Sequence, residues 1–156
     1  PIKMIPQATN AQEALTIAIQ MEKRAIGLYE RAQILFSTPK VADALQWLLE
    51  EERRHLEVFI KMLGNESTMN EKAQLLSAQA ADILHPGGLM AAARERAFED
   101  EHSLIVYAAR EEESAVQHYQ TFAEACTGEA RETFLLIAQE EQEHLHTLNT
   151  LLESDT

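Results

Sequence analysis

The fold is decided by a short charged stretch, LLEEERRHL, at residues 48–56. It places three glutamates, two arginines and His55 inside a segment that is otherwise rich in helix-forming residues. Such a run is usually the solvated face of a helix, and the alternative is that one glutamate and the histidine point inward. The stretch QEEQEHL at residues 139–145 repeats the Glu-Glu-x-x-His element with different neighbouring charges. The choice between the two interpretations therefore depends on the hydrophobic pattern around both copies.

The two copies belong to an internal repeat that extends well beyond them. A shift of the chain by 90 residues places Glu22 and Tyr29 over Glu112 and Tyr119. A shift by 89 residues aligns the two Glu-Glu-x-x-His elements. The sequence therefore predicts two similar halves, each carrying one glutamate with a tyrosine and one Glu-Glu-x-x-His element.

Glycine and proline are few, and they fall between segments rich in Ala, Leu, Glu and Gln. Asn10, with Glu13 three residues later, is typical of the cap at the start of a helix. Thr38 followed by Pro39 is typical of the cap and the first residue of a second helix. We expect four main helices, at about residues 10–36, 39–64, 101–125 and 129–153. Shorter helical pieces are expected at residues 70–85 and 89–99.

These lengths predict an all-α protein with the architecture of a four-helix bundle. The short connections make each pair of helices antiparallel neighbours, and a long, partly helical crossover at about residues 65–100 joins the two pairs. At 156 residues the chain is long enough to bury a core without disulfides. We expect one domain, residues 1–156.

The composition limits the partners and the cofactors. The chain has 26 acidic and 13 basic residues, and its net charge of -13 repels nucleic acid and anionic membranes but attracts cations. The single cysteine, Cys126, excludes an internal disulfide and a thiolate-rich zinc or iron-sulfur site. No apolar run reaches the ~20 residues of a membrane span, and the amino end lacks the layout of a secretory signal. We expect a cytoplasmic protein that binds neither nucleic acid nor membrane.

Helical spacing places one glutamate of each main helix in the middle of its apolar face. Two histidines follow on the same faces, three residues after a glutamate. The inward residues are Glu22, Glu52, His55, Glu112, Glu141 and His144.

A buried, unpaired carboxylate costs several kcal/mol, and no basic residue lies on the four apolar faces. Two divalent or trivalent cations would balance four carboxylates, and two neutral imidazoles would complete the ligand shells. Four Glu and two His in Glu-x-x-His spacing form the ligand set of di-iron and di-manganese carboxylate bundles. The sequence therefore predicts a site for two metal ions, with iron or manganese the best match and zinc able to bind.

The pattern resembles the ferritin-like superfamily, and most closely its rubrerythrin-like branch. The resemblance covers the four main helices, and its motifs are Glu22 with Tyr29, Glu52-x-x-His55, Glu112 with Tyr119, and Glu141-x-x-His144.

The resemblance implies a role for each inward residue. Glu52 and Glu141 would bridge two iron ions, Glu22 and Glu112 would be terminal ligands, and each histidine would supply one nitrogen to one metal. By the same resemblance, the two tyrosines would hydrogen-bond to ligating carboxylates. The alternative for both tyrosines is an ordinary core aromatic with a satisfied hydroxyl.

Three departures from related families bear on function. Rubrerythrins carry a further glutamate where this chain has Ala115, and they end in a cysteine-rich rubredoxin domain that these 156 residues do not contain. We therefore expect a separate electron-donor protein. Bacterioferritins share the ligand set but have a haem-binding methionine at the position of Arg53 and a further short helix after the position of Leu152. We expect no haem.

The leading hypothesis is a non-haem di-iron oxidoreductase that reduces hydrogen peroxide or dioxygen. One alternative is a ferroxidase coupled to iron storage, of bacterioferritin type, which requires a hollow oligomer. Another is a non-enzymatic helical protein whose metals stabilise the fold for interaction with a partner. The resemblance also implies a homodimer.

The remaining polar residues carry little weight. We expect surface positions for His85, His102, His118 and His146, and an idle thiol at Cys126. The acids beside the inward residues are expected to be mostly solvated, namely Glu50, Glu51, Glu111, Glu113, Glu140 and Glu143.

Overall fold

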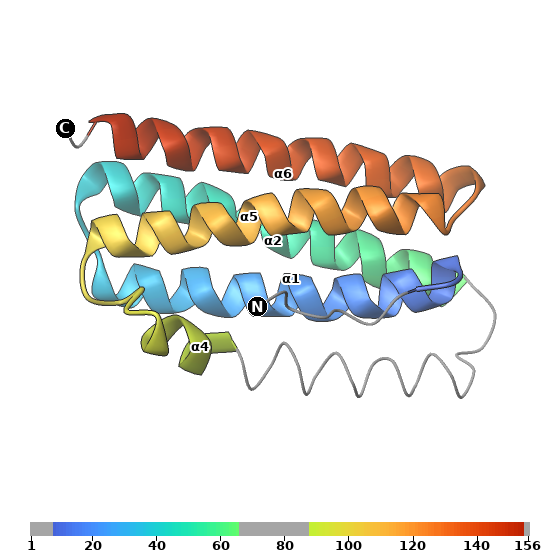
Figure 1. Cartoon of the computed structure of the whole chain (residues 1–156), viewed down its shortest axis with the longest axis horizontal. Helices are drawn as coiled ribbons and strands as arrows, with labels where there is room; N and C mark the ends of the chain where they lie inside the picture. The colour runs from blue at the N-terminus through green and yellow to red at the C-terminus, as the bar shows by residue number, and fades with distance from the viewer. Residues whose placement is uncertain (1–7, 66–87, 155–156) are drawn as a thin grey trace.

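The computed structural model describes residues 8–65 and 88–154 and shows the predicted all-α four-helix bundle (Figure 1). Its helices are α1 (Ala11–Leu35), α2 (Pro39–Asn65), α4 (Gly88–Arg94), α5 (Glu101–Glu124) and α6 (Gly128–Ser154). The four main helices match their predicted ranges to within two residues. The helix expected at residues 70–85 lies outside the described residues. Within the described ranges, no helix is long and apolar enough to cross a membrane.

The first helix begins with the predicted cap, and the second begins at the predicted Pro39 after Thr38. The Asn10 side chain accepts a hydrogen bond from the Glu13 backbone N–H at 2.9 Å. The Glu13 carboxylate reaches back to the Thr9 N–H at 2.9 Å, one residue earlier than predicted. Thr38 directly precedes Pro39, the first residue of α2, as predicted, and its carbonyl accepts from the Ala42 N–H at 2.7 Å. Its hydroxyl donates to Glu101 Oε1 at 2.8 Å. Thr38 therefore links the first hairpin to the start of α5.

The segment before α5 is less helical than the sequence predicts. Helix α4 ends at Arg94, and Arg96 has a left-handed backbone with φ of 64°. Asp100 then caps α5 by accepting from the Ser103 N–H at 2.7 Å. At the far end of α5, Gly128 has a φ of 59°, a conformation that glycine adopts without strain, and α6 starts there.

The main helices form two antiparallel hairpins, α1 with α2 and α5 with α6 (Figure 1). Helix α1 also packs against α5, α2 packs against α6, and the short helix α4 lies against α1. Helix α2 ends at the opposite end of the bundle from the start of α5 (Figure 1). The connection between the hairpins therefore spans the length of the bundle, as predicted for this topology.

Two apolar clusters fill the bundle, one toward each end. The first contains Phe59, Tyr119 and Phe134, whose rings pack with centroids 5.2–5.9 Å apart. The second contains Leu48 and Leu104 among its fully buried side chains. In all four main helices the predicted inward glutamates fall between the residues of the first cluster and those of the second. The fold thus places a polar layer at mid-length between two apolar layers.

Candidate metal centre

The six predicted inward side chains meet at the middle of the bundle. All of them are buried, with exposed fractions of 3% or less, namely Glu22, Glu52, His55, Glu112, Glu141 and His144. Ligand atoms of the four residues in the two Glu-x-x-His elements lie within 4.8 Å of one another. Every main helix contributes, because each carries its polar residue at the same level between the two apolar clusters. The buried Glu and His residues form a candidate site for two metal ions.

Three carboxylates surround the inner nitrogen of His55. Its Nδ1 lies 3.4 Å from Glu52 Oε1, 3.4 Å from Glu141 Oε1 and 3.6 Å from Glu22 Oε2. The first two carboxylates come from the Glu-x-x-His elements, and the third comes from α1. This group forms one half of the candidate site.

The other half is built in the same way around His144. Its Nδ1 lies 2.8 Å from Glu141 Oε1, 3.0 Å from Glu52 Oε1 and 3.5 Å from Glu112 Oε2. Glu52 and Glu141 therefore approach both histidines, whereas Glu112 approaches only His144 within the described part of the chain. Two carboxylates are thus shared between the halves, and each half has one further carboxylate. The expected roles as bridging and terminal ligands stay predictions.

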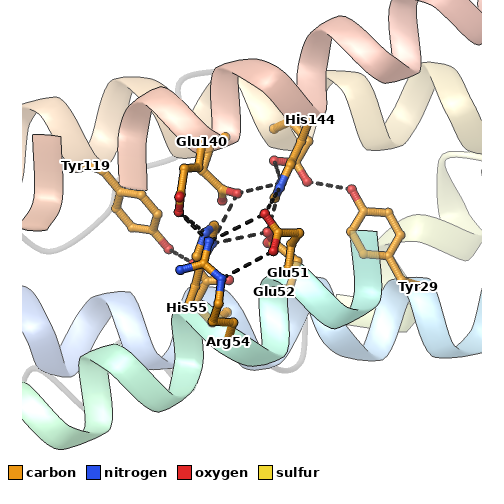
Figure 2. A network of polar contacts seen from close by, with 11 residues as sticks. Tyr29, Glu51, Glu52, Arg54, His55, Tyr119, Glu140 and His144 are labelled. Carbon is orange, nitrogen blue, oxygen red and sulfur yellow. Dashed lines mark hydrogen bonds and ion pairs between the residues drawn. The ribbon is translucent and has the colours of Figure 1, made fainter. Parts of the chain in front are cut away.

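Both tyrosines hydrogen-bond to the glutamates of the opposite hairpin. The Tyr29 hydroxyl on α1 donates to Glu112 Oε1 at 2.6 Å, and the Tyr119 hydroxyl on α5 donates to Glu22 Oε2 at 2.7 Å. Burial, followed by the nearby glutamates, raises the pKa of each tyrosine well above its ordinary value, so both hydroxyls keep their protons. Figure 2 shows the two rings on either side of the cluster. The predicted contacts to the carboxylates are confirmed, and each tyrosine orients its partner from across the bundle.

The outer nitrogens of the histidines face residues that the sequence analysis assigned to solvent. Glu140 Oε1 accepts from His55 Nε2 at 2.9 Å and from Arg54 Nη2 at 2.6 Å. Arg54 also contacts Glu51 at 3.2 and 3.4 Å, and Glu51 Oε1 lies 3.9 Å from His144 Nε2 (Figure 2). A carboxylate can only accept a hydrogen bond, so His55 Nε2 carries the proton and donates the hydrogen bond to Glu140. Its Nδ1 then turns an acceptor lone pair toward the cluster when the imidazole is neutral.

The expectation that the flanking acids are mostly solvated was therefore wrong for half of them. Glu50, Glu113 and Glu143 are exposed, whereas Glu51, Glu111 and Glu140 are half-buried and form ion pairs. Among the other histidines, His102 and His146 are exposed as expected and His118 is half-buried, with its Nδ1 donating to the Ser114 carbonyl at 2.6 Å. His85 lies outside the described residues. Cys126 is buried.

The carboxyl groups of the cluster hold protons more tightly than usual. Burial, and then the charge of Glu52, raises the pKa of Glu22 to about 8 and that of Glu112 to about 7. Burial, and then Glu112 and Glu22, also raises the pKa of Glu141. Without a bound cation, these groups avoid mutual repulsion by staying partly protonated at neutral pH.

The histidines respond in the opposite sense to burial. Burial alone would lower the pKa of His55, but contacts with Glu141 and Glu22 raise it strongly. Burial alone would also lower the pKa of His144, but its contacts with Glu112 and Glu141 raise that pKa to about 12. In the metal-free protein the two imidazolium ions thus supply the positive charge that cations would otherwise bring. Metal binding must displace these protons.

The inner atoms of the cluster fit a pair of cations. One oxygen of each of the four glutamates and the Nδ1 of each histidine are buried without a hydrogen bond of good geometry to any described residue. Buried polar atoms are normally satisfied, so six such atoms at one place call for a ligand. Carboxylate oxygen and imidazole nitrogen suit iron and manganese, and also accept zinc. That these six residues bind the metals stays a prediction.

The comparisons with known proteins agree with this geometry. The rubrerythrin family model matches residues 1–81 and 103–155. Searches of curated proteins and of solved structures found no match. The family match covers α1, α2, α6, all of α5 except its first two residues, and every residue of the candidate site. On this match over most of its length, the chain belongs to the rubrerythrin family.

Proposed function

We propose that the protein is a non-haem di-iron oxidoreductase that reduces hydrogen peroxide or dioxygen to water. For peroxide, the reaction consumes two electrons and two protons for each molecule and yields two waters. A separate donor protein supplies the electrons. The reaction is proposed for the buried cluster of four glutamates and two histidines, and the family assignment supports it.

The single observation that carries the proposal is the set of unsatisfied inner atoms in a layer closed off by apolar clusters. Four buried acids have a large desolvation cost, which two bound cations would offset. Iron suits these oxygen and nitrogen ligands and can change its charge during a reaction. Two ferrous ions held by these residues would supply the two electrons for peroxide reduction.

The protein's own residues have distinct tasks in this proposal. Glu52 and Glu141 would hold both metals, while Glu22 and Glu112 would each hold one. The tyrosine hydroxyls fix the orientation of the latter two carboxylates and keep a proton close to them. Ala115 is buried one turn after Glu112, and its small side chain would leave room for a small oxidant. The apolar layers on both sides limit the access of water.

The test is the reaction of the ferrous protein with peroxide, followed under anaerobic conditions by stopped-flow absorption. Wild-type protein should be oxidised to the ferric form within seconds. Glu52→Gln should lose the reaction, because Gln cannot bridge two cations as a carboxylate does. Glu50→Gln is the matched control, since Glu50 is exposed on the same helix two residues away. An absence of spectral change in iron-loaded wild-type protein would refute the proposal.

Oligomeric state separates this function from iron storage. We expect a homodimer, which light scattering coupled to size-exclusion chromatography measures directly. A large hollow oligomer that takes up iron mineral would instead indicate a ferroxidase that serves storage.

A further inference from the structure

The two halves of the candidate site differ at the outer nitrogens of their histidines. His55 Nε2 donates a hydrogen bond of 2.9 Å to Glu140 Oε1. His144 Nε2 is buried without a hydrogen bond to any residue in the described part of the chain, and Glu51 Oε1 lies 3.9 Å away. The internal repeat aligns Glu140 with Glu51, so the same residue type is used differently in the two halves.

Arg54 accounts for this difference. Its guanidinium donates to Glu140 Oε1 at 2.6 Å, which is the same oxygen that accepts from His55, and so fixes that carboxylate beside the ring. Its other contacts, at 3.2 and 3.4 Å, hold the Glu51 carboxylate beyond hydrogen-bond distance of His144 (Figure 2). One arginine thus positions one carboxylate on its histidine and restrains the other.

The surroundings of His144 are also different from those of His55. The Trp47 and His144 rings pack in a T-shaped arrangement, with centroids 5.0 Å apart and planes at 80°. In the repeat, Trp47 corresponds to Leu136 and Arg54 corresponds to Glu143, both of which are exposed. Trp47 and Arg54 therefore make the surroundings of the two outer histidine nitrogens unequal, and both residues come from the first half of the chain.

We propose that the two metal positions are unequal, with the position at His55 and Glu22 binding the first cation and the position at His144 and Glu112 binding the second, more weakly and exchangeably. The inference rests on the metal centre of the proposed function. A carboxylate on the outer N–H of a ligating histidine fixes the ring and makes the inner nitrogen more basic, and its loss typically costs ~10–100-fold in metal affinity. Only the His55 position has this support.

The test is a titration of the metal-free protein with Co²⁺ alone, followed by calorimetry and by visible absorption. Two steps are expected in wild-type protein. Two cations that share bridging carboxylates repel each other, so two steps would also arise at equal positions, and the variants decide the matter. Glu140→Gln should lower the Co²⁺ affinity of the first step about tenfold, which is the typical effect of losing an outer partner of a ligating histidine. Glu51→Gln removes the same charge from the position that aligns with Glu140 in the repeat. It should change the Co²⁺ affinity of the first step less than about threefold.

Arg54→Gln tests the restraint directly, because it frees Glu51 to approach His144 and releases Glu140. The ratio between the two binding constants should shrink at least about threefold relative to the control. Arg53→Gln is the matched control: it removes the same charge one residue away, where the side chain pairs with the exposed Glu30. Equal ratios in the two arginine variants would overturn the role of Arg54.

The outcomes separate this inference from the proposed function. If Glu140→Gln leaves the affinity of the first step within about twofold of wild type while two Co²⁺ ions still bind, Glu140 does not strengthen the His55 position, and only this inference fails. If the Co²⁺ steps behave as expected but ferrous protein does not react with peroxide, only the proposed reaction fails. If wild-type protein binds no Co²⁺ in the cluster, both fail.

Discussion

Tyr29 and Tyr119 each act on a carboxylate that their own helix does not carry. Tyr119 orients Glu22 and Tyr29 orients Glu112, so the hydroxyl groups connect the two hairpins at the level of the candidate site. The repeat explains why both contacts cross between the hairpins, because two similar hairpins packed symmetrically make equivalent contacts in both directions. The contact is therefore a property of the assembled bundle and not of a single helix.

Replacement of Tyr119 by Phe should weaken metal binding about tenfold, the lower end of the effect expected for an outer partner of a ligand. The ring is fully buried, so Phe keeps the packing and removes only the hydrogen bond. Tyr107→Phe is the control, because Tyr107 is a buried tyrosine whose hydroxyl contacts Arg24 instead. Co²⁺ titration measures the effect, and equal affinities for the two variants would contradict this role for Tyr119.

The raised pKa values predict an unusual dependence of stability on pH for the metal-free protein. The pKa of Glu22 is about 8 in the folded protein and 4.5 ordinarily, so the folded state binds more protons between these values. The unfolding free energy therefore falls as pH rises from about 4.5 to 8. The raised pKa of His144 adds to the fall above its ordinary 6.5. Glu140 and Asp100 have lowered pKa values and titrate below this range.

Urea unfolding in the presence of a chelator measures this effect. Stability at pH 8 should be several kcal/mol lower than at pH 5, because Glu22 is completely buried. Glu22→Gln should flatten the slope, since the amide does not titrate. Stability that rises over this range would show that the cluster is not buried as described.

The helices themselves were largely predictable, because their start and stop residues are local in sequence. The Asn10 cap and the positions of the buried glutamates follow from spacing alone. The contacts of Glu140 could not be predicted in the same way, because they depend on how α2 and α6 are rotated against each other. The repeat held a usable indication: both elements keep a glutamate directly before the inward one, and that residue lies near the histidine of the other element in each half.

Packing between helices should account for most of the stability of α6. Phe134 is fully buried against Phe59, Tyr119 and Phe122, with ring centroids 5.2–5.9 Å apart. Phe134→Ala should destabilise the metal-free protein by about 3–5 kcal/mol, through lost transfer energy and the cavity left behind.

Leu136→Ala is the control for this change, because Leu136 lies two residues away on the same helix and is 56% exposed. It should change stability by less than about 0.5 kcal/mol. Chemical unfolding of both variants at one pH gives the comparison. Similar losses for the two variants would show that this face of α6 is not packed as described.

The bundle as a whole consists of two similar hairpins, but the residues around the outer nitrogens of the two histidines differ between them. The topology, the long connection and the polar layer at mid-length follow from the sequence pattern, because the four glutamates divide each helix at the same level. The family is confirmed by the match over most of the chain. The single domain, the homodimer and the separate electron donor stay predictions.

The most direct test of the account is anomalous X-ray diffraction from crystals of iron-loaded protein. It should show two iron peaks inside the bundle, with Glu52 and Glu141 contacting both and one histidine contacting each. Protein prepared with ample iron that shows no peak among these side chains, or that shows them turned out to solvent, would contradict the account.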